Sequence, residues 1–433
     1  MPKRLNATDE NFTSTFNAVV AAKRDTEADV SDVVKDIIAD VRNRGDEAII
    51  EYTRRFDRFD ISENDMRVPV QQIEAAREKC DSNTLKALEL AAERIQSFHQ
   101  RQLPEDLDYR DPQGIRLGYR WTPVRAAGLY VPGGTAAYPS SVLMNGIPAK
   151  VAGVDRIVMT VPATEGVLNP LVLAAAQIIG IDEVYKIGGA QAVAALAYGT
   201  VSIQAVDKIV GPGNIYVATA KQQVYGAVGI DMIAGPSEIL IVADDQNDPS
   251  WIAADLLSQA EHDTSAQSIL ITDSESFSVA VENALNEQMS ALPRKAIAQK
   301  SWEQNGTIII VKKLSDAVPL IDQLAPEHLE LAVEDADQIA AQVRNAGAIF
   351  IGRNTPEAVG DYIAGPNHVL PTARSARFSS GLGVLDFMKR STFVNCDEAS
   401  LKTIGSEIIT LAEAEGLDAH ARSVSIRLKQ KNS

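Results

Sequence analysis

Short apolar runs alternate with segments of helix length through most of the chain, and this alternation constrains the possible folds more than any other feature. One series begins at residue 155 and includes RIVMTV, EVYKIG, DKIVG and EILIVAD; a second includes QSILITD, GTIIIVKK, LELAV and AIFIG. Strands that are apolar on both faces and alternate with helices are typical of parallel sheets. The sequence therefore predicts an α/β fold with two Rossmann-like parallel-sheet units.

The first third of the chain is expected to be largely helical. Apolar residues between Val30 and Val41 recur at i, i+3, i+4, i+7, i+8 and i+11, which is one stripe of an amphipathic helix. Further helices are expected at 70–80 and 84–101, followed by strands at 115–124 and 127–131. The residues after Gly381 again favour helices. We therefore expect small helical extensions at both ends of the chain.

The composition excludes several classes of protein. Asp and Glu number 58 against 41 Lys and Arg, so the chain lacks the basic footprint of a protein that neutralises nucleic-acid phosphates. No run of about 18 apolar residues is present, and no apolar segment follows the basic residues near the N-terminus, so neither a membrane span nor a signal peptide is expected. Two cysteines are too few for a disulfide framework or a cysteine-based zinc site. These features predict a soluble protein of the cytoplasm.

Four loops rich in Gly and Pro stand out in the α/β region, at residues 131–141, 187–192, 210–216 and 233–239. Parallel sheets bind ligands at the carboxyl ends of their strands, and Gly allows the backbone to approach a ligand closely. The dinucleotide fingerprint G-x-G-x-x-G is absent. Any one of these loops is equally consistent with an ordinary tight turn. The four together favour a ligand-binding crevice.

The five histidines are few enough to consider singly. Gln259 and His262 are three residues apart, so they share one face of a predicted helix, as two metal ligands would. The same spacing is more often found on a solvated polar face. His99 lies near a predicted helix end and is expected at the surface. The other three histidines lie beside carboxylates in turn-rich segments or near helix ends, as Glu327–His328, Asp361–His368 and Glu415–His420. This arrangement indicates a metal site or an acid–base site assembled from distant segments.

Six longer motifs carry a resemblance to a known family. They are IDMIAGPSEILIVAD, WIAADLLSQAEHDTSAQSILIT, YVPGGTAAYPSSVLMNGIPAKVAGV, GPGNIYVATAKQQV, LAPEHLEL and GPNHVLPTARSARFSSGLGVLDFMKR. With these motifs the chain resembles the histidinol dehydrogenase family from about residue 30 to residue 425. Members of that family oxidise L-histidinol to L-histidine through L-histidinaldehyde and reduce two NAD. They work as homodimers with one zinc ion per active site.

The resemblance implies a set of site residues, each carried over by its motif. The implied catalytic residues are Glu327 and His328. The implied zinc ligands are Gln259, His262, Asp361 and His420. The implied substrate contacts are Ser237, Gln259, His262, His328, Glu357, Asp361, His368, Glu415 and His420, and the implied NAD contacts are Tyr130, Gln191 and Asn214.

The resemblance also implies a division of labour between the two catalytic residues. Removal of a hydroxyl proton as hydride leaves suits a base with a pKa near neutrality, here His328. Hydration of the aldehyde before the second hydride transfer suits a carboxylate, here Glu327. In such a homodimer the C-terminal arm crosses to the partner, so that His420 completes the other subunit's site.

Together these observations predict a division into domains. Residues 25–129 and 237–380 are expected to form one discontinuous α/β domain that carries much of the zinc and catalytic site. Residues 130–236 are expected to form a second α/β domain with the NAD-binding loops. Residues 1–24 and 381–433 are expected to be small terminal segments involved in dimerisation.

Three alternatives remain on sequence alone. A related enzyme of the same fold would oxidise another alcohol, such as a sulfonated diol, but Glu357, His368 and Glu415 stand where the histidinol pocket requires them. A zinc hydrolase would leave the NAD loops unexplained, and no HExxH motif is present. A non-catalytic binding protein on an α/β scaffold is the third. We favour the NAD-dependent zinc dehydrogenase.

Overall fold

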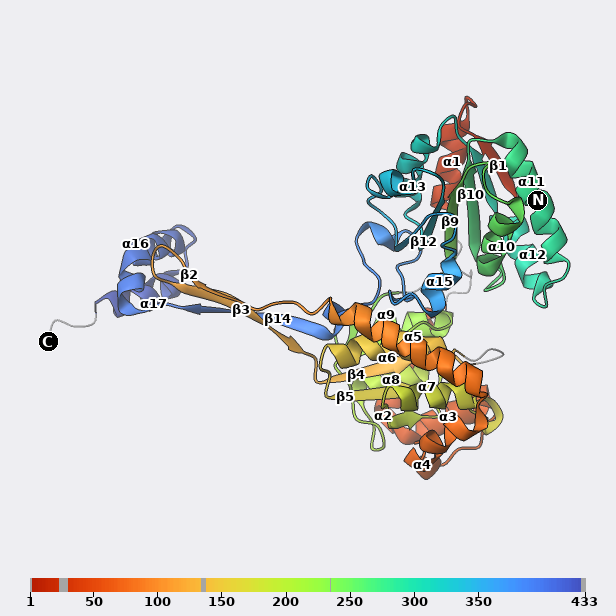
Figure 1. Cartoon of the computed structure of the whole chain (residues 1–433). Helices are drawn as coiled ribbons and strands as arrows, with labels where there is room; N and C mark the ends of the chain where they lie inside the picture. The colour runs from red at the N-terminus through yellow and green to blue at the C-terminus, as the bar shows by residue number, and fades with distance from the viewer. Residues whose placement is uncertain (1, 23–29, 134–137, 234, 430–433) are drawn as a thin grey trace.

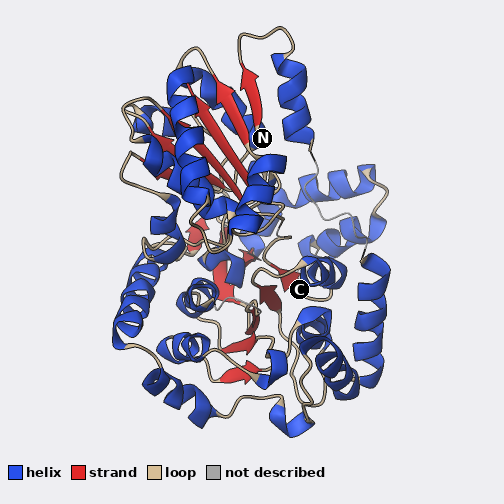
Figure 2. Cartoon of the chain, turned by 90° about the vertical axis from the view of Figure 1, so that its right-hand side faces the viewer, coloured by secondary structure: helices blue, strands red, loops and turns tan. Residues whose placement is uncertain are grey.

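The protein consists of two parallel α/β units and a projecting arm (Figure 1). This computed structural model describes residues 2–22, 30–133, 138–233 and 235–429. The arm extends away from both units and ends near the C-terminus (Figure 1). Helices cover both faces of each parallel sheet (Figure 2). The predicted α/β class with two parallel-sheet units is therefore confirmed.

The first unit is built on a six-stranded sheet in which every neighbouring pair is parallel. In spatial order its strands are β1 (Lys3–Asn6), β11 (Thr307–Ile310), β10 (Gln267–Thr272), β9 (Glu238–Ala243), β12 (His328–Ala332) and β13 (Ala348–Ile351). Side chains alternate between its faces. Ile239 and Ile241 join the core formed with α10 (Pro249–Ala260), α11 (Glu275–Met289) and α12 (Lys295–Asn305). Leu240 and Val242 join the core formed with α1 (Phe12–Ala21), α13 (Val318–Leu324) and α14 (Ala336–Ala340).

The second unit is built on a five-stranded parallel sheet. Its strands in spatial order are β6 (Glu183–Tyr185), β5 (Arg156–Thr160), β4 (Ala126–Tyr130), β7 (Lys208–Val210) and β8 (Gly229–Ile230). One face packs against α4 (Val70–Glu74), α5 (Ser82–Gln100), α6 (Pro139–Val151) and α7 (Pro170–Ile178). The other packs against α2 (Ser31–Arg44), α3 (Asp46–Asp57), α8 (Gly189–Tyr198) and α9 (Ile215–Val224).

The structure corrects the predicted grouping of residues 25–129 with 237–380. Helices α2 to α5 pack on the five-stranded sheet: Val34 and Ile37 lie in one core with Leu196 of α8, and Ile95 lies in another with Leu143 of α6. An amphipathic pattern shows that a helix has an apolar face, but it does not show which sheet covers that face. The helices therefore precede, along the chain, the sheet on which they pack.

The N-terminal segment is also corrected, because it is part of the first unit rather than a separate helical extension. Its four-residue strand β1 pairs in parallel with β11, and its helix α1 contributes Phe16 and Val19 to the core of the six-stranded unit. Such a short edge strand shows only one buried residue, Leu5, which gives no detectable period. The boundary predicted at 24–25 falls outside the described residues.

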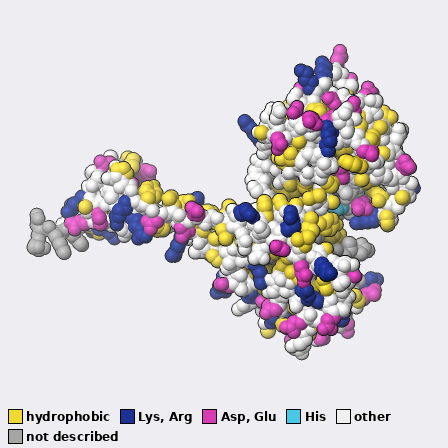
Figure 3. All heavy atoms as spheres, in the orientation of Figure 1, with side chains coloured by type: hydrophobic (Ala, Val, Ile, Leu, Met, Phe, Trp, Pro, Cys, Tyr) yellow, Lys and Arg dark blue, Asp and Glu magenta, His cyan; other side chains and the backbone are white. Residues whose placement is uncertain are grey.

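The arm is a three-stranded antiparallel sheet followed by two helices. Its strands are β14 (Met388–Asn395), β3 (Arg116–Pro123) and β2 (Leu107–Arg110), and its helices are α16 (Glu398–Ala414) and α17 (Asp418–Leu428). The strand expected at 115–124 is confirmed as β3, but β14 was not predicted. Hydrophobic side chains lie on the surface of the arm (Figure 3), and the exposed ones include Val394, Leu411 and Ile426.

Shorter elements complete the fold. The site described below includes helix α15 (Glu357–Tyr362). The 3₁₀ helices are Glu63–Asp65, Ala75–Lys79, Thr164–Gly166, Leu314–Ala317, Ser375–Arg377 and Val384–Phe387. Among the described residues, no helix combines the length and the apolar character needed to cross a membrane.

Candidate active site

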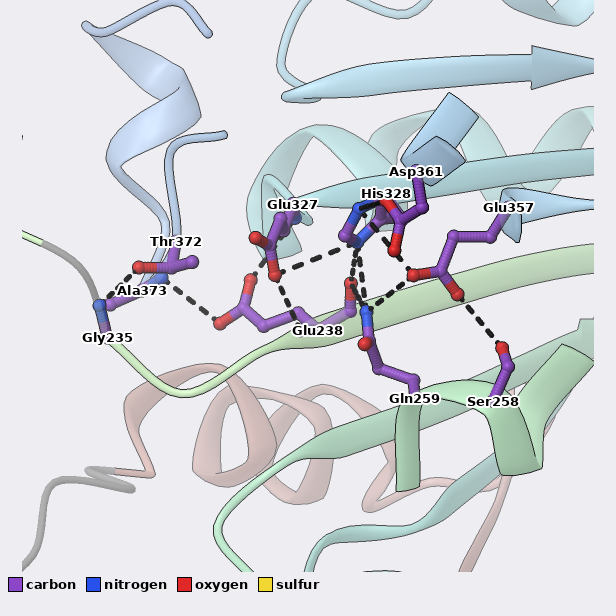
Figure 4. Close-up of polar contacts among 10 residues, drawn as sticks. All are labelled: Gly235, Glu238, Ser258, Gln259, Glu327, His328, Glu357, Asp361, Thr372 and Ala373. Carbon is purple, nitrogen blue, oxygen red and sulfur yellow. Dashed lines mark hydrogen bonds and ion pairs between the residues drawn. The ribbon is translucent and has the colours of Figure 1, made fainter. Parts of the chain in front are cut away.

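The candidate site forms at the amino ends of two neighbouring strands of the six-stranded sheet. His328 is the first residue of β12 and Glu238 is the first residue of β9. Helix α10 brings Gln259 back to this edge, and the short helix α15 adds Glu357 and Asp361 (Figure 4). The expectation that the ligand site lies at the carboxyl ends of the strands therefore does not hold for this sheet. These side chains come from the starts of strands and from the segments that return to them.

His328 is the centre of the cluster. Its ring is almost fully buried, with Nδ1 2.9 Å from the backbone oxygen of Glu238. Its Nε2 lies 3.6 Å from carboxylate oxygens of both Glu357 and Asp361, and its Nδ1 lies 3.6 Å from a carboxylate oxygen of Glu327. Burial opposes protonation, but the three carboxylates outweigh it and raise the pKa of His328 to about 9. The three carboxylates therefore favour the protonated form of the imidazole.

Gln259 links His328 to Glu357. Its amide nitrogen donates hydrogen bonds to the Glu238 backbone oxygen and to Glu357 Oε1, each at 3.2 Å, and lies 2.9 Å from His328 Nδ1. Its amide oxygen is buried and has no hydrogen-bond partner within the described part of the chain. A buried oxygen without a partner is costly unless something else binds it.

The two acidic residues of α15 differ in their protonation behaviour. Burial raises the pKa of Glu357 to about 7, although His328 opposes this shift, and Glu357 also accepts a hydrogen bond from Ser258 at 3.0 Å. Burial would raise the pKa of Asp361 as well, but its contact with His328 outweighs that effect and lowers it. Asp361 is therefore the ionised partner of the imidazole.

A metal ion fits this donor set. One atom each from His328, Glu357 and Asp361 lie within 4.8 Å of one another, and the unpartnered amide oxygen of Gln259 belongs to the same cluster. Nitrogen and oxygen ligands of this kind suit zinc. Of the predicted ligand set, Gln259 and Asp361 are brought together. His262 follows α10; desolvation lowers its pKa and Asp361 partly offsets this.

Two of the residues predicted for the site lie elsewhere. His420 and Glu415 are exposed and belong to the arm, on and just before α17, away from the cluster (Figure 1). By contrast, His368 accompanies Asp361, since its Nδ1 lies 2.9 Å from the Asp361 backbone oxygen. Ser237 directly precedes β9 and is half-buried.

Glu327 is held by the backbone of the neighbouring strand. Its Oε2 accepts the backbone N–H of Glu238 at 2.9 Å, and its side chain is almost completely buried. Sequence reasoning missed Glu238, although it directly follows the predicted contact Ser237. It also missed Ser258, which is next to Gln259. Neither has a spacing signature; only their adjacency to assigned residues could have suggested them.

A cavity of about 370 Å³ adjoins the cluster where the two units meet. Phe98 and Gln102 line it from the α5 side, and Phe350, Asp361 and His368 line it from the six-stranded unit. A small polar molecule could therefore reach Asp361 and His368 from the junction.

His99 directly follows Phe98 on α5. It is fully buried, with Nδ1 2.8 Å from the Ile95 backbone oxygen, which corrects its expected surface position.

The predicted NAD contacts lie at the carboxyl end of the other sheet. Tyr130 ends β4, and its hydroxyl accepts the Gly189 N–H at the start of α8 at 3.0 Å. Gln191 in α8 is buried, with its Oε1 unpartnered among the residues described, and Asn214 caps α9. Gly211 has φ +112°, and a Cβ there would lie 2.1 Å from the Tyr130 backbone oxygen. Three of the four Gly-rich loops thus meet at one edge, although residues 134–137 of the first are not described.

The fold and the cluster define a two-unit α/β enzyme whose histidine–carboxylate site opens at the junction of its units. The sequence profile of histidinol dehydrogenase matches residues 20–428. The chain belongs to the histidinol dehydrogenase family, and is accordingly an oxidoreductase of histidine biosynthesis.

Individual relatives match this chain along its whole length. A histidinol dehydrogenase of Rhodospirillum rubrum is 61% identical over 431 residues, covering 99% of both chains. One of Rhodopseudomonas palustris is 59% identical over 431 residues, covering 100% of both. The crystal structure of histidinol dehydrogenase from Elizabethkingia anophelis is 37% identical, with a TM-score of 0.94 over 100% of this chain and 99% of that one.

Proposed function

We propose that this enzyme oxidises L-histidinol to L-histidine through L-histidinaldehyde, with reduction of two NAD and with one zinc ion per site. The observation that carries the proposal is the buried His328, surrounded by carboxylates and by a Gln259 amide whose oxygen has no partner among the described residues. Family membership and the names of the relatives support the substrate.

The charge of the site suits this substrate. Histidinol carries a primary ammonium group and an imidazole, and the pocket presents Glu357 and Asp361 on one side and Glu327 on the other. His368 lies beside Asp361 at the cavity wall. These groups would pair with the ammonium and imidazole of the substrate, whereas a sulfonate would be repelled by the same carboxylates.

Zinc would be held by Gln259, His262 and Asp361, with His420 supplied by a partner subunit. When bound, it would supply a Lewis acid that fixes the nitrogen atoms of the substrate rather than a metal-activated water. The donor chemistry supports this assignment, because an amide oxygen, imidazoles and a carboxylate are all present without cysteine.

His328 would remove the hydroxyl proton in each oxidation. Its Nδ1–H donates to the Glu238 backbone oxygen, which leaves Nε2 as the basic nitrogen facing Glu357 and Asp361. A cationic substrate among these carboxylates would take over part of the stabilisation that now raises the pKa of His328 to about 9. That pKa would then fall toward neutrality, where a general base is most effective.

Glu327 would activate the water that hydrates the aldehyde. Its carboxylate lies on the Nδ1 side of His328, opposite Glu357 and Asp361, so the two catalytic groups are neighbours with separate positions. After His328 has released the first proton to solvent and the aldehyde has been hydrated, His328 would remove the second hydroxyl proton as the second hydride leaves. Holding the aldehyde in the site between these steps would prevent loss of a reactive intermediate.

A homodimer would complete the site. His420 and Glu415 lie on the projecting arm, apart from the cluster of their own chain, and the arm exposes hydrophobic side chains that a second copy could cover. This geometry supports a site shared between subunits.

Substrate competition tests the proposed function. The zinc-loaded enzyme should oxidise histidinol with NAD at a rate far above that with a sulfonated diol of similar size. A preference for the sulfonated diol would overturn the assignment. A chain that hydrolyses substrates without NAD would contradict it as well.

A further inference from the structure

Glu238 and Glu327 each accept the other's backbone N–H with a carboxylate oxygen. The Glu238 N–H donates to Glu327 Oε2 at 2.9 Å, and the Glu327 N–H donates to Glu238 Oε2 at 3.3 Å. The two residues stand side by side at the starts of the parallel strands β9 and β12, because His328 pairs with Ile239 (Figure 4). Both side chains are more than nine-tenths buried.

The second oxygen of Glu238 holds a loop on the opposite side. Its Oε1 accepts the Ala373 N–H at 3.2 Å, and the neighbouring Thr372 Oγ1 accepts the Gly235 N–H at 2.5 Å (Figure 4). Ala373 and Arg374 both have positive φ, 51° and 65°, which is unfavourable for residues with a Cβ and requires support from their surroundings. Glu238 thus ties this loop to the β12 strand start.

The backbone of Glu238 also touches the other catalytic residue, since its oxygen accepts the Nδ1–H of His328. One residue therefore fixes the carboxylate of Glu327 through its N–H and the ring of His328 through its C=O. We propose that Glu238 is a positioning residue that sets the orientation of the Glu327 carboxylate for water activation, a role that rests on the proposed function of Glu327.

The chemistry requires a carboxylate at this position. Its two oxygens accept two N–H groups at once, from Glu327 and Ala373. In Glu238→Gln one of those oxygens becomes an NH₂ group, so one N–H faces another donor and a buried hydrogen bond is lost. His328 keeps its bond to Glu238, which is to the backbone C=O, whereas Glu327 is joined to Glu238 by two bonds and the one from its own backbone N–H depends on the Glu238 side chain. Misplacement of Glu327 should therefore affect the aldehyde step more than the alcohol step.

The test measures each half-reaction with the zinc-loaded enzyme, starting from histidinol or from histidinaldehyde. Glu238→Gln should lower kcat for aldehyde oxidation by about 10- to 100-fold. Its KM should stay within about twofold, and alcohol oxidation should fall less, since the general base keeps its backbone partner. Thr307→Val is the matched control, because Thr307 is a buried polar residue that starts β11, two strands from β9. It should leave both rates unchanged.

A double-mutant cycle with Glu327→Gln separates positioning from general damage. If Glu238 acts through Glu327, adding Glu238→Gln to Glu327→Gln should slow aldehyde oxidation no further. Fully additive losses would overturn the positioning role, as would a wild-type rate in Glu238→Gln when Glu327→Gln is slow. If Glu327→Gln itself oxidises the aldehyde at the wild-type rate, both the proposed role of Glu327 and the positioning role of Glu238 are wrong. Should Glu238→Gln fail to fold, Glu238→Asp keeps the charge but is too short to reach both N–H groups, and the same selective loss is expected.

Discussion

The side-chain nitrogen of Gln259 lies 2.9 Å from His328 Nδ1, while the amide oxygen of Gln259 stays buried without a hydrogen-bond partner among the described residues. A residue assigned to the metal thus touches the residue assigned as the base. The free oxygen is the ligand atom that zinc would take.

Replacement of Gln259 by Met should weaken zinc binding by at least about tenfold, because the variant keeps the length of the side chain but loses the oxygen ligand. Competition with a chromogenic chelator measures this. Gln288→Met is the control, because Gln288 lies on the neighbouring helix α11 and its amide binds the Ser250 backbone oxygen instead. Equal zinc affinity in both variants would remove Gln259 from the ligand set.

His328→Asn should slow both oxidations by about 10²- to 10⁴-fold, the usual contribution of a general base. Bound zinc should remain near one per chain, because the variant keeps the proposed ligands Gln259, His262 and Asp361. Metal analysis and the two half-reaction rates check this pair of outcomes. Loss of zinc together with activity would instead make His328 a ligand, as its 3.6 Å distance to Asp361 would permit.

Subunit mixing tests the shared site. His420→Ala and His262→Ala chains should each be inactive alone, because each loses a proposed zinc ligand from every site. In a mixed dimer one site receives both defects and the other receives none, so activity should return to at most one intact site per heterodimer. Persistent inactivity after confirmed subunit exchange would show that the arm does not complete the partner's site.

Asp57 should make stability depend on pH. Burial raises the pKa of this carboxyl to about 6, and its Oδ2 has no hydrogen-bond partner within the described residues. Because the folded-state pKa lies above the unfolded value, the associated stability is present below about pH 4 and is lost as pH rises through 6. Asp57→Asn should therefore raise the Tm by roughly 3–6 °C at pH 8 and by little at pH 4.

Glu47→Gln is the control for this comparison, since Glu47 lies exposed on the same helix, α3. Its Tm should follow that of the parent at both pH values. An equal gain at pH 4 and pH 8 in Asp57→Asn would show that ionisation of Asp57 is not the cause.

The alternation of apolar runs predicted both parallel sheets because buried parallel strands are apolar on both faces, as β9 and β10 show with every residue buried. The same pattern could not place α2 to α5, since an amphipathic stripe such as that of Val34 and Ile37 fits either sheet. It also missed β14, whose residues are mostly exposed in the arm and have no buried face to mark the strand.

Motif resemblance selected His328, Gln259, Glu357 and Asp361 as site residues, and the structure brings these four side chains together. Glu238 was not predicted from the sequence, for a physical reason. A carboxylate that accepts backbone N–H groups across two strands has partners that are close only after folding, and any residue type can donate its backbone N–H. His420 is the opposite case. Its motif predicts a zinc ligand, but within one chain His420 lies on the arm, away from the cluster.

The stoichiometry of NADH production tests the central proposal most directly. With histidinol limiting and NAD in excess, the zinc-loaded enzyme should form two NADH per histidinol and release histidine. A chelator should abolish this and added zinc should restore it. One NADH per histidinol, none, or full activity after verified removal of the metal would contradict the proposal.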